Sequence, residues 1–369
     1  MGADGSGEAG TEAGEERPGA LRDLLAAMPK AELHLHLDGG LRIETALELA
    51  RSRGVDAPTT AAGMRAALVA PERCASQAEL LRAFDLPIAL LQDAEALERV
   101  AAELVDDKAA DRVRYLEVRW APALHTARGL GAAEVIEAVA RGAADAARRT
   151  GTTLRLLCTA MRSHPPAANV RLAEVAAGCR HLGLAGFDLA GPEEAFPDPA
   201  AHRGAIEAAR AGGLGITLHA GEWGGAAQVR AALALNPARI AHGPGAVDDP
   251  ALCAELRARA VTLDLCPTSN VQAGIVPSLA AHPLAILHRR GVPVTLSVDD
   301  PTVGDVSLSE EYRRAVEDVG LSLAELWAID RHALDVAFAD EAALAPLRTE
   351  FDAWAAARTE LRAGQAGSG

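Results

Sequence analysis

The sequence predicts an α/β protein folded as a (β/α)8 barrel, with a helical insertion between its first and second strands. Eight short segments rich in Val, Ile, Leu and Thr recur along the chain, as buried strands do. The segments between them show the periodicity of amphipathic helices. Strands that alternate with helices form a parallel sheet, and eight such units are what a closed barrel requires. A doubly wound open sheet is the alternative, which the strand count disfavours.

Most of the eight expected strands are bounded by Gly, Pro or Asp, residues that favour turns. The expected strands are Ala31–Leu37, Arg112–Trp120, Thr152–Ala160, Leu184–Ala190, Leu214–His219, Arg239–His242, Val261–Cys266 and Pro293–Val298.

Helical patterns fill the intervals between these strands. Residues 131–149 show the clearest one, because Val135 and Val139 share one apolar stripe with Arg and Glu opposite. Residues 249–259 and 282–290 behave similarly. These helices supply the crossovers that a parallel sheet needs.

The interval between the first two strands is unusually long. About 75 residues separate them, where a single crossover helix needs far fewer. Apolar residues such as Leu80, Phe84 and Leu91 recur there at helical spacing. In a barrel this insertion leaves the C-terminal face, where active sites lie. It is either a lid over that face or a subdomain packed against the barrel.

Length and composition fit one folded domain with short tails. Of the 369 residues, 49% are apolar and 24% are charged, which is typical of a globular protein. We predict a disordered acidic tail over residues 1–18, a single barrel domain over 19–362 and a flexible tail over 363–369. The net charge of −15 argues against binding to nucleic acid or to an anionic membrane, because both require a basic surface.

Five dispersed cysteines without a C-x-x-C pair predict a reduced, cytoplasmic protein. The first residues show neither the basic nor the apolar region of a signal peptide. No segment approaches the ~18 apolar residues of a membrane span. The sequence carries no signal for an oligomeric state.

Two histidines in the first strand, His34 and His36, point to the same face, because alternate residues of a strand do so. Imidazoles buried in an apolar strand are costly without a partner, and a divalent metal is a common partner of neutral imidazole. The alternative is a pair of hydrogen-bonded core histidines.

Further polar residues end other strands. His219 ends the fifth strand, His242 the sixth and Asp299 the eighth, and these ends meet at the catalytic face of a barrel. Three histidines and one carboxylate suit Zn²⁺ with a position open for water, so the pattern predicts a catalytic metal site. Glu222 lies three residues after His219, where it can move protons between water and substrate. The alternative is a glutamate in the first turn of a helix.

Local patterns elsewhere are weaker. The Asp-Asp-Pro of 299–301 recurs at 248–250, where no strand precedes it and helix capping explains it. Asp38 follows the first strand in an Asp-Gly-Gly segment, which a plain turn explains equally well. Neither lysine, Lys30 or Lys108, lies on a predicted strand, so a modified lysine bridging two metals is absent and one metal is expected. The sequence also lacks the H-x-E…P-C-x-x-C zinc signature, a phosphate-binding loop and a dinucleotide fingerprint.

Six segments together resemble the adenosine deaminase family, in its order and strand positions. They are MPKAELHLHLDGGLR, GFDLAGPEE, LHAGEWGG, RIAHG, LCPTSN and SVDDP, within residues 28–345. The resemblance implies a zinc-dependent hydrolase that converts adenosine or 2′-deoxyadenosine to the inosine product and ammonia, by attack of metal-bound hydroxide at purine C6.

The resemblance also implies roles for individual residues. Glu222 would protonate N1 of the purine, His242 would orient the hydroxide, and Asp300 would hydrogen-bond N7. One Zn²⁺ per chain, for which iron or cobalt could substitute, would have four ligands: His34, His36, His219 and Asp299.

On the substrate side, the resemblance implies that the Gly191 backbone N–H meets N3. Asp38 would reach the ribose 5′-hydroxyl with His36 nearby. An apolar wall would surround the base, formed by Leu80, Phe84 and Met161. AMP would need a basic phosphate cradle, to which Arg42, Arg119 and Arg162 are the candidate contributors.

Three alternatives remain open. Departures from the family after Pro301 and in the insertion fall on the sugar side of the pocket. A 5′-modified adenine nucleoside, such as aminodeoxyfutalosine or S-adenosylhomocysteine, is therefore the alternative substrate. An amidohydrolase of another substrate class would have no clear task for Glu222 and Asp300. A non-catalytic binding protein would not need the intact ligands or Glu222.

Overall fold

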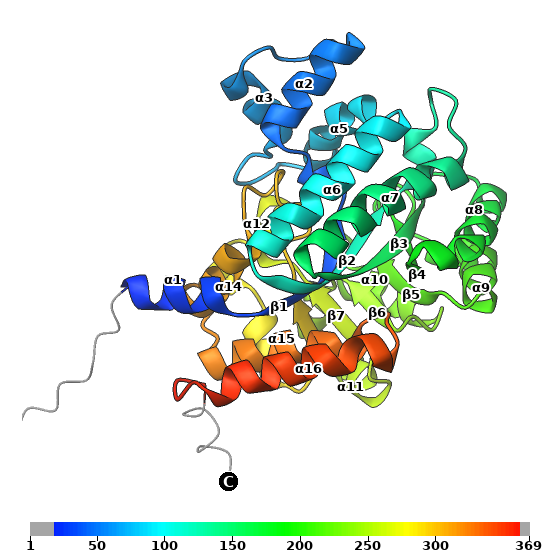
Figure 1. Cartoon of the computed structure of the whole chain (residues 1–369). Coiled ribbons are helices and arrows are strands. Elements are labelled where there is room, and N and C mark those ends of the chain that lie inside the picture. The colour runs from blue at the N-terminus through cyan, green and yellow to red at the C-terminus, as the bar shows by residue number, and fades with distance from the viewer. Residues whose placement is uncertain (1–17, 362–369) are drawn as a thin grey trace, which may run out of the picture.

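The structure is a computed structural model that describes residues 18–361. Its eight strands lie in the order β1 to β8, and every neighbouring pair is parallel. This confirms the predicted (β/α)8 barrel with a helical insertion after the first strand (Figure 1). The two predicted tails lie outside the described residues, apart from Pro18, which begins α1.

The strands match the predicted segments within two residues at each end. They are β1 (Lys30–His36), β2 (Val113–Trp120), β3 (Thr153–Met161), β4 (Leu184–Ala190), β5 (Gly215–His219), β6 (Arg239–Ala241), β7 (Thr262–Leu265) and β8 (Val294–Leu296).

Hydrogen bonds between β1 and the segment after β8 close the barrel. The backbone N–H of His36 donates to Asp299 O at 2.8 Å, and the N–H of Asp299 donates to His34 O at 3.1 Å. Leu35 and Asp299 thereby form an isolated parallel bridge. This seam brings the two histidines of β1 beside the carboxylate that follows β8.

The prediction that neither lysine lies on a strand is wrong for Lys30, which begins β1. Its ammonium donates to Met28 O and Asp111 O, each at 2.9 Å, at the N-terminal end of the barrel. Lys108 lies on the helix before β2, and its Nζ is 3.0 Å from Glu32. Both lysines are buried in these contacts. The N-terminal position of Lys30 keeps it away from the strand ends where a bridging lysine would act.

Helices surround the barrel, and within residues 18–361 none combines the length and hydrophobicity that a membrane crossing requires. The helices are α1 (Pro18–Ala27), α2 (Ile43–Arg53), α3 (Ala61–Leu68), α4 (Gln77–Leu81), α5 (Asp85–Leu90), α6 (Ala94–Ala110), α7 (Ala132–Thr150), α8 (Pro166–Gly178), α9 (Arg203–Ala211), α10 (Gly225–Leu233), α11 (Pro250–Ala258), α12 (Pro267–Gln272), α13 (Leu284–Arg289), α14 (Leu308–Glu317), α15 (Leu323–Val336) and α16 (Glu341–Ala356). Asp249 caps α11 through the N–H of Leu252, as predicted for the Asp-Asp-Pro of 248–250.

The two ends of the barrel are covered differently. At the N-terminal end, Ala31, Leu33 and Tyr115 pack against Leu334 of α15 and Phe351 of α16. Figure 1 shows α16 across this end and the insertion helices α2, α3 and α5 at the other. The insertion therefore lies at the C-terminal end of the strands, where the predicted site residues are.

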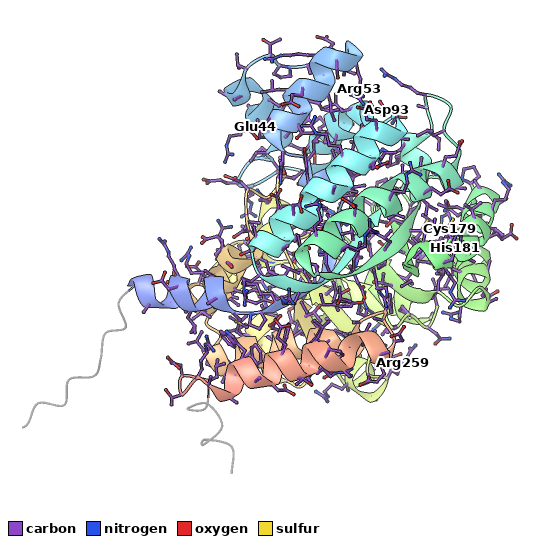
Figure 2. The ribbon with its side chains drawn as sticks, viewed as in Figure 1. Glu44, Arg53, Asp93, Cys179, His181 and Arg259 are labelled. Atoms are coloured by element: carbon purple, nitrogen blue, oxygen red, sulfur yellow. The ribbon has the colours of Figure 1, made fainter. Side chains whose placement is uncertain are left out.

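An ion pair ties the outer helices of the insertion to α6, the helix that precedes β2. Arg53 ends α2, and its Nη2 donates to Asp93 Oδ1 at 2.8 Å (Figure 2). Asp93 also caps α6 by accepting from the N–H of Ala96. The guanidinium of Arg53 is largely buried, so this contact fixes α2 against the start of α6.

The lower interior of the barrel contains a buried ion-pair network. The Arg239 guanidinium contacts both Glu117 and Asp264, with Arg239 Nε 3.1 Å from Asp264 Oδ2. Arg119 lies one layer higher, with Nη1 3.4 Å from Asp188 Oδ2 and Nη2 3.8 Å from Asp264 Oδ2. All five side chains are fully buried, so each charge depends on these partners for solvation.

Candidate active site and metal centre

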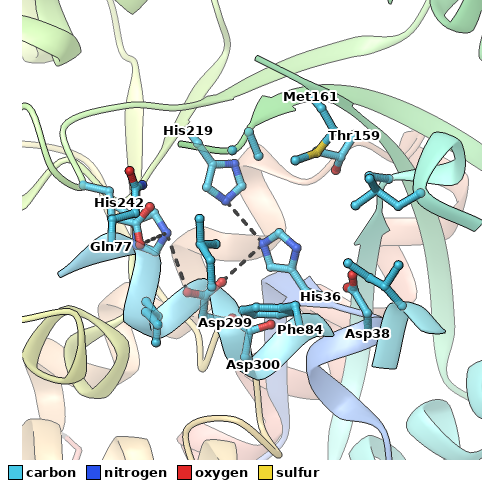
Figure 3. Close-up of a pocket in the computed structure, with 18 of the residues that line it drawn as sticks. His36, Asp38, Gln77, Phe84, Thr159, Met161, His219, His242, Asp299 and Asp300 are labelled. Carbon is cyan, nitrogen blue, oxygen red and sulfur yellow. Dashed lines mark hydrogen bonds and ion pairs between the residues drawn. The ribbon is translucent and has the colours of Figure 1, made fainter. Parts of the chain in front are cut away.

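A pocket of about 280 Å³ opens at the C-terminal end of the strands, beneath α4 and the turn Arg82–Phe84 (Figure 3). Every predicted site residue except His34 lines it. These are His36, Asp38, Leu80, Phe84, Met161, Gly191, His219, Glu222, His242, Asp299 and Asp300. His34 lies fully buried directly beneath them.

Four donor atoms converge at the floor of the pocket. His34 Nε2 lies 3.3 Å from His36 Nε2, and His36 Nε2 lies 3.3 Å from His219 Nε2. Asp299 Oδ1 is 3.0 Å from His34 Nε2 and 3.3 Å from His36 Nε2. In a tetrahedral zinc site with bonds of ~2.0–2.1 Å, neighbouring ligand atoms are ~3.3 Å apart. The spacing of this cluster therefore fits a tetrahedral metal.

His242 borders the same cluster. Possible ligand atoms of His34, His219, His242 and Asp299 all lie within 4.8 Å of one another. However, His242 Nε2 approaches the other carboxylate oxygen, Asp299 Oδ2, at 3.6 Å, and lies 3.8 Å from Glu222 Oε1. His242 is therefore placed between the donor cluster and Glu222.

The protonation states suit metal binding. Burial lowers the pKa of His34 well below its ordinary value and lowers that of His36 to about 3, so both imidazoles are neutral. Burial is the largest single influence on the Asp299 carboxyl and raises its pKa, but the neighbouring His34, His242 and His36 together outweigh burial and hold this pKa well below its usual range. Neutral imidazoles and an anionic carboxylate are the forms that bind a divalent metal.

Two further carboxyl or hydroxyl groups orient these donors. Asp188 on β4 lies 2.9 Å from His219 Nδ1, which leaves His219 Nε2 to face the cluster. The hydroxyl of Ser269 donates to Asp299 Oδ2 at 2.8 Å. Partners of this kind fix the orientation of metal-binding side chains. Sequence reasoning missed Asp188, although a charged residue inside the apolar run of β4 was a visible signal.

Two residues of the site that lie beyond strand ends have a left-handed backbone. His242 has φ 68° and Asp299 has φ 69°, a region that non-glycine residues rarely adopt. His242 directly follows β6, so its left-handed backbone accounts for the end of β6 at Ala241, one residue before the predicted end. Such strain is typical of functional sites.

Glu222 lies in the loop between β5 and α10. The helix begins only at Gly225, so the alternative of a first-turn helix glutamate is wrong. Glu193 fixes this loop, because its carboxylate accepts from the N–H groups of Gly221, Trp223 and Gly224 at 2.7–2.8 Å. Glu193 was also missed from sequence, since its partners are backbone groups that no motif shows.

The surroundings of Glu222 favour the neutral form of its carboxyl. Burial, followed by the charges of Asp299 and Glu193, raises the pKa of Glu222 well above its ordinary value. A neutral carboxyl at neutral pH can donate its proton, as a general acid must.

Asp300 and Asp38 have buried oxygens without a partner. Asp300 Oδ1 and Asp38 Oδ1 make no hydrogen bond among the described residues. Burial raises the pKa of both carboxyls, and the neighbouring Asp299 raises that of Asp300 further. Gly39 makes room for Asp300, because a Cβ there would lie 1.8 Å from Asp300 Oδ1. Two unsatisfied buried oxygens that face a pocket indicate a polar ligand.

The remaining wall is mostly apolar. Leu80 and Phe84 come from the insertion, and Met161 ends β3 (Figure 3). Gly191 follows β4 with φ 109°, and a Cβ there would lie 3.0 Å from Met161 Cε. Sequence reasoning missed other lining residues whose helix or strand positions gave no chemical signal, namely Gln77, Ile88, Leu124, Thr159 and Trp223.

None of the three candidate arginines for a phosphate cradle lines the pocket. Arg42 pairs with Asp107 at the surface at 2.6 Å. Arg119 is buried in the ion-pair network, and Arg162 donates to His219 O at 2.8 Å beneath the pocket wall. Besides the carboxyls of Glu222, Asp299 and Asp300, two further carboxyl residues, Asp38 and Asp85, line the pocket instead.

The chain matches known proteins over most of its length. The model of the adenosine deaminase family matches residues 29–354. An adenosine deaminase of Mycobacterium ulcerans is 39% identical over 335 residues, covering 86% of this chain and 92% of that protein.

Solved structures agree with this match. An amidohydrolase from Burkholderia ambifaria with bound Zn has a TM-score of 0.84 at 29% identity, covering 94% of this chain and 96% of that one. An N6-methyl-AMP deaminase from Arabidopsis thaliana has a TM-score of 0.80 at 30% identity, covering 90% of this chain and 98% of that one. Since the family match spans nearly the whole described chain, this protein belongs to the adenosine deaminase family.

Proposed function

We propose that the chain hydrolyses adenosine and 2′-deoxyadenosine to the corresponding inosine and ammonia, with one Zn²⁺ bound. The observation that carries this proposal is the position of the Glu222 carboxyl, largely shielded from solvent and 3.8 Å from His242, beside the histidine and aspartate cluster at the end of a largely apolar pocket that raises its pKa. An acid so placed can activate a heteroaromatic ring toward attack by water. Simple amide or phosphoester hydrolysis gives no comparable task to Glu222 and Asp300.

The metal would be held by His34, His36, His219 and Asp299. We prefer His36 to His242 because its Nε2 lies 3.3 Å from each of three other donors, whereas His242 faces Glu222. A bound Zn²⁺ would lower the pKa of a water from 15.7 to about 7 and supply hydroxide near neutral pH. Iron or cobalt would suit the same donors.

The residues of the chain then handle the purine. Glu222 holds a proton and delivers it to N1, which makes C6 electrophilic. His242 orients the attacking water toward C6. As the water oxygen bonds to C6, one of the water protons restores the Glu222 carboxyl and the other passes to the exocyclic nitrogen. The bond between C6 and that nitrogen then breaks, ammonia leaves, and the product is the 6-oxo purine with the proton on N1. Each interaction strengthens as charge develops, as catalysis requires.

Other residues would bind and orient the substrate. The neutral carboxyl of Asp300 would donate to N7, and the Gly191 N–H would meet N3. Leu80, Phe84 and Met161 would cover the base and exclude water. At the sugar end, the unpartnered Oδ1 of Asp38 would accept from a ribose hydroxyl.

The charge of the pocket favours a nucleoside over a nucleotide. Among the described residues no Arg or Lys lines it, and Asp38 and Asp85 would repel a phosphate. We therefore expect no turnover of AMP, although a related structure is that of an N6-methyl-AMP deaminase. A cytoplasmic location, expected from the cysteine pattern, stays a prediction.

Ammonia release from zinc-loaded protein tests the proposal. The panel contains adenosine, 2′-deoxyadenosine, adenine, AMP, S-adenosylhomocysteine and aminodeoxyfutalosine, with the Glu222→Gln protein as the control for contaminating activity. We expect turnover of the first two compounds alone. Turnover of AMP would refute the charge argument, and turnover of only a 5′-modified nucleoside would replace the substrate. Silence across the panel with zinc bound would favour an amidohydrolase of another substrate class.

A further inference from the structure

A hydrogen-bond chain lies behind His242 and runs through two residues with no role in the proposed reaction. Asn270 on α12 is fully buried, and its Nδ2 lies 3.2 Å from His242 Nδ1. His282 precedes α13, and its Nε2 lies 3.1 Å from Asn270 Oδ1. The chain ends at the backbone N–H of Leu284, which is 3.2 Å from His282 Nδ1.

The far end of this chain fixes its direction, because a backbone N–H can only donate. His282 Nδ1 must accept from Leu284, so neutral His282 carries its proton on Nε2. That proton is donated to Asn270 Oδ1, which turns the amide NH₂ toward His242. His242 Nδ1 then accepts, and the proton of neutral His242 lies on Nε2.

The Nε2 atom of His242 faces the reacting region. It lies 3.6 Å from Asp299 Oδ2 and 3.8 Å from Glu222 Oε1, between the donor cluster and the acid. An N–H in this position donates to the attacking water and directs its oxygen lone pair. A bare lone pair there would instead compete for the metal. His242, Asn270 and His282 are all buried, so bulk water does not reset the tautomer.

We propose that Asn270 and His282 are positioning residues that set the tautomer of His242, so that it presents an N–H to the attacking water. The inference rests on the proposed function, because it assigns His242 to that water. It explains why a buried amide and a second buried imidazole stand in line behind the site.

A purely structural role is the competing explanation. The bond between His282 and Asn270 connects α12 to the segment that precedes α13, and the bond between Asn270 and His242 connects α12 to the end of β6, so their loss would destabilise the packing of α12. The two explanations differ in one observable, which is the position of the proton on His242. If the role is purely structural, substitution of Asn270 lowers activity while the proton of His242 stays on Nε2. If Asn270 sets the tautomer, the loss of activity accompanies a move of that proton to Nδ1.

Asn270→Asp is the sharpest test, because it keeps the shape of the side chain and replaces the NH₂ donor by an acceptor. The carboxylate still accepts from His282, so His242 must carry its proton on Nδ1 to bond it. In serine proteases, the change that inverts the tautomer of the catalytic histidine lowers kcat by about 10⁴ with the geometry intact. We expect kcat to fall by about 10²–10⁴, KM to stay within about threefold and zinc content to stay unchanged.

Nitrogen-15 NMR of zinc-loaded, histidine-labelled protein reads the tautomer without any substrate. We expect His242 to show Nε2–H in the wild type and Nδ1–H in Asn270→Asp, with the His242→Gln spectrum giving the assignment. Activity lost while the proton stays on Nε2 would overturn the proposal. Wild-type kcat with the proton on Nδ1 would overturn it equally. Failure of the proposed function would show separately, as a wild type silent on the substrate panel.

Substitutions of His282 provide a second, independent test. His282→Phe removes the donor that orients the Asn270 amide, and we expect kcat to fall at least about tenfold. His282→Gln restores an N–H donor and should bring kcat back within about threefold. His332→Phe is the matched control, since His332 Nε2 bonds Thr262 Oγ1 at the start of β7, at the other end of the barrel. Equal loss of kcat in His282→Gln and His282→Phe, or in the control, would contradict the proposal.

Discussion

The upper and lower parts of the barrel interior both bury charged side chains, but they satisfy them differently. In the lower part, Glu117 and Asp264 bond the guanidinium of Arg239, which also donates to Val336 O at 2.7 Å. At the upper end, Glu222 and Asp300 form no ion pair with an arginine or lysine among the described residues, and Asp300 Oδ1 has no hydrogen-bond partner there either.

This difference distinguishes buried charged groups that stabilise the fold from those that serve the proposed reaction. A buried ion that the protein itself neutralises contributes to the fold, and removing one partner exposes the cost of the other. A buried carboxyl without a neighbouring cation becomes neutral, or its hydrogen-bonding oxygens stay unpartnered until a ligand binds. Asp188 belongs to both parts, because one oxygen faces Arg119 and both lie near His219.

The largest expected effect is at the metal cluster. Asp299→Ala removes the only carboxylate among the proposed ligands, so zinc should be lost and activity should fall to background. Elemental analysis of the purified protein measures the metal. Asp264→Ala is the matched control from the lower interior, and it should keep zinc while it unfolds more easily. Full zinc occupancy in Asp299→Ala would show that the fourth ligand lies elsewhere.

Glu222→Gln tests whether the unpaired upper carboxyl is the acid. The amide is of similar size but cannot donate an acidic proton, so kcat should fall by about 10²–10⁴ or more. Zinc content and the unfolding temperature should stay close to wild type. Turnover near the wild-type rate would remove Glu222 from the proton transfer.

Arg239→Met tests the lower interior by leaving Glu117 and Asp264 without their shared cation. The free energy of unfolding should fall by about 3–5 kcal/mol, because two buried carboxylates lose their partner. Urea unfolding measures this change, and the folded fraction should keep kcat within about threefold. The double variant with Glu117→Gln should recover part of the loss. A stable Arg239→Met protein with damaged catalysis would break the division between the two parts.

Glu311 sharpens the comparison, because it is buried and bonded only by neutral donors. Its carboxylate accepts from the N–H of Thr268 at 2.8 Å and from the Thr268 hydroxyl. Burial raises the pKa of Glu311 to about 7, so the folded state binds a proton that the unfolded state has already lost above about pH 4.5.

The resulting stability is fully present below about pH 4.5 and is lost as the pH rises through about 7. We expect a decrease of about 1–3 kcal/mol from this group, measured by urea unfolding at several pH values. Glu311→Gln should flatten the pH dependence over this window. A slope that persists unchanged in the variant would assign the titration to another carboxyl, such as the buried Asp330, whose pKa burial also raises to about 7.

The cluster of proposed metal ligands was predictable from sequence because the positions of its residues follow from strand periodicity and from the common end of parallel strands. Two histidines at alternate positions of one strand share a face, and parallel strands end at one edge, so His219 and Asp299 had to lie near them. The residues that support the cluster were not predictable in the same way. Glu193 accepts from backbone N–H groups, and Asn270 and His282 act through His242. None of these three residues has a characteristic spacing in the sequence.

The ends of strands were also beyond sequence reasoning. The left-handed backbone at His242 ends β6 one residue early, yet histidine does not favour that conformation enough for the end to be predicted. The predicted first strand began one residue after Lys30. A buried lysine whose ammonium donates to backbone carbonyls can begin a strand as readily as it can precede one, so its residue type does not decide the boundary.

The burial of both lysines has a practical consequence. Lys30 and Lys108 are the only lysines among the 36 basic residues, and neither ε-amino group is exposed in the fold. Reagents that acylate amines therefore reach these side chains only after β1 or α6 opens. The rate of acylation at each lysine, followed by mass spectrometry, measures how often that element opens. A chemistry that usually reports surface exposure thus reports opening of the barrel in this protein.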